Sequence, residues 1–118
     1  MFSRCFQDVI VWQQAHRWVL DIYKFTEKFP KHEMFGLTSQ LRRAAISIPA
    51  NFAEGFGKRT KPEKARFYNI AQGSIEECRY YMILAQDLNY GSTTKLLEDL
   101  NSVAYLLVAY LRGLQQAE

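Results

Sequence analysis

Basic side chains are concentrated in the middle of the chain, where they could bind phosphate groups. Residues 42–66 contain seven Lys and Arg residues and two Glu residues, a local net charge of +5, whereas the whole chain carries +3. Because Lys and Arg neutralise backbone phosphates, this cluster favours salt-dependent binding of nucleic acid with little sequence preference. The alternative is a solvated turn without a ligand. The candidate residues for binding RNA or single-stranded DNA are Arg42, Arg43, Lys58, Arg59, Lys61, Lys64 and Arg66.

Motifs for catalysis or cofactor binding are incomplete in this sequence. The stretch GFGKRT at 55–60 is similar to a phosphate-binding loop, but Phe52 occupies the position of the first glycine and Arg59 that of the Ser or Thr. His32 and Glu33 begin like a zinc-protease motif, but no second histidine follows at the required spacing. We therefore expect a protein that is not an enzyme, with no catalytic residues, no metal site and no cofactor.

Apolar residues recur every three or four positions in four segments, which predicts four helices. Asp8 is the expected cap of the first helix, and Thr60 with Glu63 forms a capping box in front of the third. Gly55 and Gly57 are expected to end the second helix. The expected ranges are about 8–29, 37–56, 61–89 and 93–113.

Short connectors between long helices predict an all-α, antiparallel, up-down-up-down four-helix bundle. Residues 1–118 are expected to form a single domain, because the chain contains no linker, repeat or low-complexity tract. Cys5 and Cys78 do not make a disulfide framework, and no apolar run approaches the ~20 residues needed to span a bilayer. We expect a reduced, cytoplasmic protein with no membrane partner.

Pro49 falls inside the second predicted helix, where a proline costs about 3 kcal/mol. One interpretation is a bend around the bundle, with the Ser47 hydroxyl bonding to a freed carbonyl. The other is a second packed face that contacts a neighbouring subunit through small residues. Asn51 and Glu54 are interpreted as structural, hydrogen-bonding across helices or subunits, because no nucleophile or metal partner accompanies them. The candidate interface residues are Ile46, Pro49, Ala50, Asn51, Ala53, Glu54, Gly73 and Ser74.

Several stretches of the chain resemble one known family. They are VWQQA at 11–15, FP at 29–30, LTSQLRRAAISIPANFAEGFGKRT at 37–60 and FYNIAQGSIEECRYYMILAQDLNY at 67–90. Over roughly residues 6–114 the chain resembles the four-helix bundle proteins named after 23S rRNA intervening sequences. Some members of this family are encoded inside insertions in bacterial 23S rRNA genes. The resemblance implies a left-handed bundle and a ring-like homopentamer.

The family is more distantly similar to the accessory protein of diversity-generating retroelements, a basic pentameric bundle that binds nucleic acid and a reverse transcriptase. Two functions therefore stay open. The first is a non-enzymatic homopentamer that binds RNA or other nucleic acid through the basic turn between the second and third helices, with Tyr68 nearby. The second is an adaptor whose ring binds a protein partner without nucleic acid, through exposed aromatics such as Trp18, Tyr80 and Tyr90.

Overall fold

Four long helices make up most of the structure, a computed structural model that describes residues 5–116. The described residues contain no strand, and the expected all-α class is confirmed. Two short 3-10 helices, η1 and η2, accompany the long ones. In chain order the elements are η1 (Phe6–Asp8), α1 (Ile10–Thr26), η2 (Lys31–Glu33), α2 (Leu37–Phe56), α3 (Lys61–Asp87) and α4 (Thr94–Gln116).

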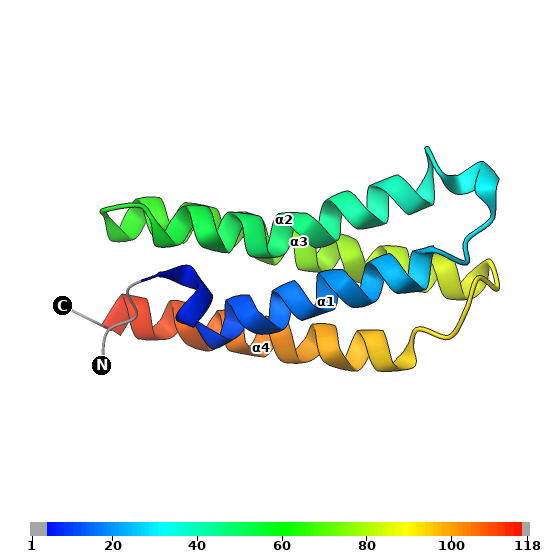
Figure 1. The fold of residues 1–118 in the computed structure, drawn as a ribbon. Helices are drawn as coiled ribbons and strands as arrows, with labels where there is room; N and C mark the ends of the chain where they lie inside the picture. Colours follow the sequence, from blue (N-terminus) through cyan, green and yellow to red (C-terminus); the bar gives the residue numbers. More distant parts are fainter. Residues whose placement is uncertain (1–4, 117–118) are drawn as a thin grey trace.

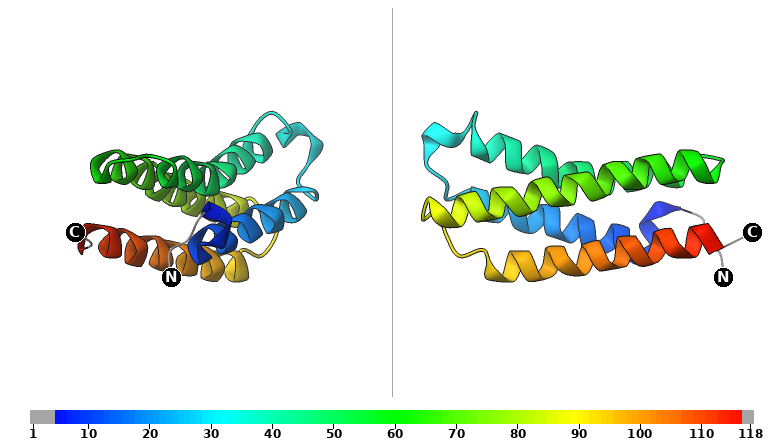
Figure 2. Two further views of the ribbon diagram at one scale, coloured as in Figure 1. Left: turned by 60° about the vertical axis from the view of Figure 1, so that its left-hand side comes forward. Right: turned by 180° about the vertical axis from the view of Figure 1, so that it is seen from behind.

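Consecutive helices run in opposite directions and lie side by side (Figure 1). α1 and α4 form one layer and α2 and α3 the other, as the two further views also show (Figure 2). The α2–α3 turn lies at the same end of the bundle as the start of α1 and the end of α4. The α1–α2 and α3–α4 connectors lie together at the opposite end. The left-handed twist of the bundle stays a prediction.

The predicted apolar stripes meet in one core between the two layers. The largest side chains that are completely buried there include Trp18, Phe52, Tyr68, Ile22 and Leu41. Burial of one such Ile, Leu or Phe side chain stabilises the fold by about 1.5–3 kcal/mol. Hydrophobic burial along the four stripes is therefore a main source of the stability of the bundle.

Two aromatics that were predicted to lie at or near a binding surface belong to the interior. Trp18 is only 2% exposed, and its indole Nε1 donates a hydrogen bond to the Leu96 carbonyl at 2.9 Å. Tyr68 is also fully buried. Tyr90 is half-buried, so of the three predicted exposed aromatics only Tyr80 is clearly exposed, at 58%. The prediction was wrong for Trp18 because this side chain lies on the side of α1 that packs against α4.

The first helix is shorter than predicted at both ends. Asp8 belongs to η1 and does not cap α1; the N-cap is Val9, which is extended and makes no side-chain bond. α1 then begins at Ile10 and ends at Thr26. Pro30 disfavours helical backbone at the preceding residue, Phe29, so it explains why the helix does not include Phe29 but not why it ends at Thr26.

The α3–α4 connector ends α3 two residues earlier than predicted, at Asp87. Asn89 and Gly91 both have positive φ angles, 62° and 151°, which the helix cannot continue through. A side chain at Gly91 would also meet the Phe25 ring at 2.8 Å. α4 continues beyond the predicted end, as far as Gln116.

Pro49 does not interrupt α2, which runs continuously from Leu37 to Phe56 with the proline buried. The Ser47 hydroxyl does not bond back to a freed carbonyl, so that expectation was wrong. Instead it accepts hydrogen bonds from Asn51 Nδ2 and from Ser74 Oγ, each at 2.8 Å. These three polar side chains link α2 to α3 within one chain.

Gly55 does not end α2, contrary to the prediction, but lies buried in its last turn. A Cβ at this position would approach the Tyr68 ring to 2.7 Å and the Phe67 side chain to 3.0 Å. Gly55 therefore allows α2 and α3 to pack closely beside their shared turn. Gly57 is the C-cap, and its φ of −80° is right-handed, so no left-handed glycine ends this helix.

Candidate nucleic-acid interface

The α2–α3 turn presents four basic side chains at one end of the bundle. Three are exposed, and Lys58 is half-buried. Because α2 and α3 meet here after a very short connector, side chains from both helices share this end. We call this group the turn patch: Lys58, Arg59, Lys61 and Arg66.

The predicted capping at Thr60 holds the turn patch in place. The Thr60 hydroxyl oxygen accepts a hydrogen bond from the Glu63 backbone N–H at 3.3 Å, which fixes the first turn of α3. The same hydroxyl donates to the Glu63 carboxylate at 2.8 Å. A capped helix start of this kind stabilises by ~1 kcal/mol, so Lys61 begins α3 from a defined position.

Lys64 has a structural role that separates it from the turn patch. Its ammonium group donates to the Phe56 carbonyl at 2.7 Å and to the Gly55 carbonyl at 3.4 Å. These are carbonyls from the last turn of α2, where positive charge is favourable. Partial burial lowers the pKa of Lys64. Because its ammonium group caps α2, Lys64 is less available to bind nucleic acid than the other predicted residues of this turn.

Phe67 lies between two members of the turn patch. Lys58 Nζ is 5.1 Å from the ring centroid, and the Arg66 guanidinium carbon is 5.6 Å from it. Cations within about 6 Å of a ring face are attracted to it. The half-buried Phe67 thus positions two cations, which the sequence did not indicate.

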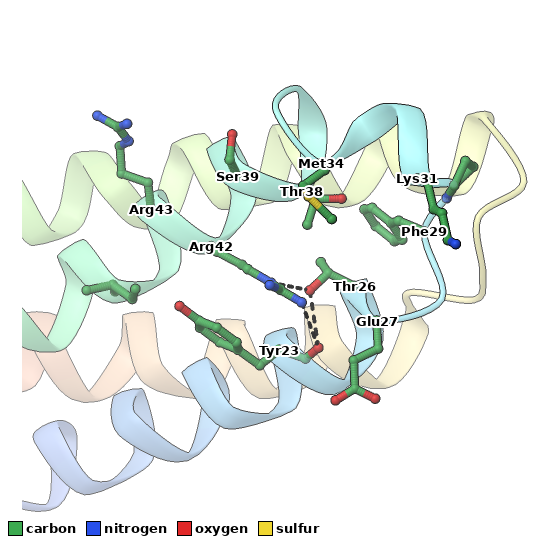
Figure 3. A pocket seen from close by; sticks show the side chains of 12 residues that line it. Tyr23, Thr26, Glu27, Phe29, Lys31, Met34, Thr38, Ser39, Arg42 and Arg43 are labelled. Carbon is green, nitrogen blue, oxygen red and sulfur yellow. Dashed lines mark hydrogen bonds between the residues drawn. The ribbon is translucent and has the colours of Figure 1, made fainter.

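The two arginines at 42 and 43 lie far from the turn patch. Arg42 lies fourteen residues before Phe56, the last residue of α2, or ~21 Å at 1.5 Å per residue, and the turn patch begins after that helix end. Arg42 reaches toward α1, where its Nε donates to Thr26 Oγ1 at 2.8 Å and its guanidinium lies 4.5 Å from the Tyr23 ring centroid (Figure 3). The seven basic residues therefore form two separate surfaces and not the single cluster that the sequence predicted.

A groove beside Arg42 was missed by the sequence reasoning. It lies between the end of α1 and the first turns of α2, and its volume is about 600 Å³. Its lining includes Tyr23 of α1, Lys31 of η2 and Arg42 of α2, together with Met34 from the loop after η2. The only sequence signal was the combination of a basic residue and an apolar residue in the connector after Pro30.

Ion pairs in the described residues do not involve either basic surface. They join Arg79 to Glu76 at 3.0 Å and Lys95 to Asp99 at 3.0 Å. His32 approaches Glu33 at 3.9 Å and pairs only when it is protonated. Within residues 5–116, no carboxylate therefore lies within ion-pair distance of the basic side chains of residues 42–66.

The predicted subunit-interface residues differ in accessibility. Pro49 and Ser74 are buried within the chain, which leaves little of them for another subunit. Asn51 and Ala53 are half-buried, and Ile46 is 42% exposed. The remaining members are exposed: Ala50, Glu54 and Gly73.

Cys78 and His16, two side chains that could do chemistry, have structural surroundings. Burial, with a smaller effect of Glu77, raises the pKa of the Cys78 thiol to about 12, so this buried thiol is not a nucleophile at neutral pH. His16 stacks on Trp12 with ring centroids 5.0 Å apart. Among the described residues, no group of three or more His, Cys, Asp or Glu side chains is arranged to hold a metal ion.

None of the helices within residues 5–116 combines the length and the apolar character that crossing a membrane requires.

Comparison with known proteins agrees with the bundle architecture. No curated protein matches the chain. The sequence model of one family, described as 23S rRNA-intervening sequence protein, matches residues 7–109. This match covers all of α1, α2 and α3 and most of α4, and its description names no reaction. Because the match covers nearly the whole length of this chain, the protein belongs to the family of 23S rRNA-intervening sequence proteins.

Proposed function

We propose that this protein is a non-enzymatic homo-oligomer that binds RNA through the turn patch. The observation that carries the proposal is the set of four basic side chains at one end of the bundle, none paired with a carboxylate among the described residues. Arg59, Lys61 and Arg66 are exposed and free of the structural bonds that engage Lys64. Uncompensated cations that share one surface favour phosphate contacts.

Oligomerisation strengthens this proposal, because each subunit adds another turn patch. Repeated weak contacts on one RNA raise the overall affinity without any new contact. A pentamer, as implied by the resemblance, carries five such patches. We assign the subunit contact to the outward face of α2, where Ile46 and Ala50 are exposed.

The first test is RNA binding across a salt series with the double variant Arg59→Glu, Lys61→Glu. We expect clearly weaker binding and a shallower salt dependence, with the log–log slope reduced by about 0.7 for each phosphate of a single strand that the variant no longer neutralises. Fluorescence anisotropy with a labelled single-stranded RNA measures the affinity at each salt concentration and hence the slope of the salt dependence. Lys28→Glu is a control for reversing one charge elsewhere, since Lys28 is exposed and belongs to the α1–α2 connector, which lies at the opposite end of the bundle (Figure 1). Wild-type affinity and slope in the double variant would contradict the proposal.

The alternative is an adaptor that binds a protein partner without nucleic acid. Large apolar side chains at the surface favour it, above all Phe35 at 91% exposed and Tyr105 at 75%. A partner that is captured by the wild-type protein, survives nuclease treatment and is no longer captured by Phe35→Ser or Tyr105→Ser would support the adaptor. Equal capture by both variants would count against these side chains as its binding surface.

A further inference from the structure

The groove between α1 and α2 combines positive charge with apolar walls. Its lining includes three basic residues and a single acidic one, Glu27. Figure 3 shows Arg42 at the centre, with Arg43 and Lys31 on opposite sides of it. The volume of about 600 Å³ is within the range of ~300–1,000 Å³ that is typical of ligand sites. The cations are thus spread along the groove instead of converging on one point.

Arg42 is held rigidly at the centre of this groove. Its Nε donates to Thr26 Oγ1 at 2.8 Å, and a terminal nitrogen donates to the Tyr23 carbonyl at 3.4 Å. These bonds use two of the five N–H groups of the guanidinium. Both acceptors are neutral oxygens, and no carboxylate of the described residues lies within 4.0 Å of Arg42. The half-buried charge therefore has hydrogen-bond partners but no counter-ion.

Arg42 also packs against the ring of Tyr23. The guanidinium carbon lies 4.5 Å from the ring centroid, so one side of the guanidinium is covered by the ring. The Tyr23 side chain is still partly open, at 38% exposed. Tyr rings and Arg planes are surfaces on which unpaired bases stack in complexes with single-stranded nucleic acid.

The residues that line the groove around the Arg42–Tyr23 pair expose apolar side-chain surface to water. Met34 is 57% exposed and Ile46 is 42% exposed. Methionine adapts its shape to flat or irregular partners, because its thioether chain has three rotatable bonds. Apolar surface between spaced cations suits a ligand that alternates negative groups with flat apolar ones.

We propose that this groove binds a segment of single-stranded nucleic acid, with a base on the Arg42–Tyr23 pair and phosphates at Lys31 and Arg43. The inference rests on the proposed nucleic-acid binding but uses a different surface, which is separated from the turn patch by the ~21 Å of α2 between Arg42 and Phe56. The spacing of the cations favours a strand over a single small anion. One subunit then contacts nucleic acid at both ends of the bundle.

The test uses a fluorescein-labelled uridine octamer and the double variant Lys31→Glu, Arg43→Glu. Both residues are exposed and make no side-chain hydrogen bond among the described residues, so the fold is expected to persist, as circular dichroism would check. Removing two phosphate-binding cations is expected to weaken binding by about tenfold or more at low salt. Lys28→Glu is again the control, because it reverses one charge next to the groove at a residue that does not line it.

The stacking surface is tested by a pair of substitutions at Tyr23. Tyr23→Ala removes the ring and is expected to weaken octamer binding by about fivefold or more. Fivefold is the lower end of the loss of affinity that is typical when the aromatic side chain under one stacked base is replaced by alanine. Tyr23→Phe keeps the ring and is expected to bind like the wild type. Equal affinity of Tyr23→Ala and Tyr23→Phe would overturn the base-stacking assignment.

The outcomes separate this proposal from the turn patch. If the groove variant binds the octamer normally while Arg59→Glu, Lys61→Glu does not, the groove proposal is wrong and the proposed function stands. If only the groove variants bind more weakly, the groove is the binding site and the turn patch is not. A polyglutamate peptide that binds as tightly as the octamer, with the same weakening in Lys31→Glu, Arg43→Glu, would overturn the assignment to nucleic acid in favour of an acidic protein segment.

Discussion

Glu33 shows how a single residue joins separate parts of the bundle. One carboxylate oxygen accepts a hydrogen bond from the Leu37 backbone N–H at 3.0 Å, at the start of α2. The other accepts from the Tyr90 hydroxyl at 2.8 Å, in the α3–α4 connector. The N-cap residue of α2, Gly36, has no side chain to do this. Glu33 therefore caps α2 from outside the helix and ties the two connectors together.

These bonds predict how stability changes with pH. The Leu37 N–H and, next, the Tyr90 hydroxyl lower the pKa of Glu33, because both bond to its charged form. A carboxylate with a lowered folded-state pKa stabilises the protein above its unfolded value of about 4.3. That stability disappears as the pH falls through the lower folded-state pKa.

We expect Glu33→Gln to lack this acid-dependent contribution. Urea unfolding from neutral pH to below pH ~4 would show a shallower decline of the unfolding free energy in Glu33→Gln than in the wild type. Tyr90→Phe is a partial control, since it removes only one of the two bonds. Parallel pH profiles for the wild type and Glu33→Gln would contradict this role.

At the scale of elements, α2 and α3 are the two helices that pack together most extensively. Ser47 and Ser74 bond across it at 2.8 Å, and Gly55 lets the last turn of α2 approach the ring of Tyr68. Lys64 of α3 caps the C-terminal end of α2 by donating a hydrogen bond to the Phe56 carbonyl. The same packing sets the position of the turn patch, so the binding surface depends on it.

Gly55→Ala is expected to destabilise the protein, although alanine is the better helix former. The new Cβ would lie 2.7 Å from the Tyr68 ring, which is buried and cannot move aside freely. Overpacking of this kind costs about 1–3 kcal/mol. Gly113→Ala is the matched control on α4, because nothing lies within 4 Å of its Cβ, and it is expected to stabilise by up to ~1 kcal/mol. Thermal unfolding that ranks the two variants the other way would disprove the close-packing argument.

At the scale of the whole molecule, the bundle separates its surfaces by position. The turn patch belongs to the α2–α3 turn, and the groove is lined by residues on both sides of the α1–α2 connector. Figure 1 shows this turn and this connector at opposite ends of the bundle. Between them, α2 presents Ile46 and Ala50 on its outward side. A subunit contact centred on Ala50 leaves the turn patch open to a ligand, whereas one that extends over Ile46 covers one wall of the groove, which Ile46 also lines.

The proposed assembly is tested by Ala50→Glu. A buried charge in a subunit contact is costly without a partner, so this variant is expected to break the oligomer while it keeps its helicity. Multi-angle light scattering gives the mass, and circular dichroism gives the helix content. Ala109→Glu is the control, an equally exposed alanine on α4. A wild-type protein that is monomeric at micromolar concentration would refute the assembly, and dissociation by Ala109→Glu alone would place the contact on α4.

The sequence by itself determined the helices, the cap at Thr60 and the family. Helix periodicity, capping and proline placement act over a few residues, so the range of α2 was predicted in full and the ends of the other helices within a few positions. The tertiary structure alone decided which side chains share a surface. Arg42 and Lys58 belong to one basic stretch of sequence, yet α2 places ~21 Å of continuous helix between Arg42 and Phe56, just before Lys58. Trp18 is buried against α4, which comes from a distant part of the chain, and Tyr68 is buried between the Phe52 ring of α2 and the Tyr110 ring of α4.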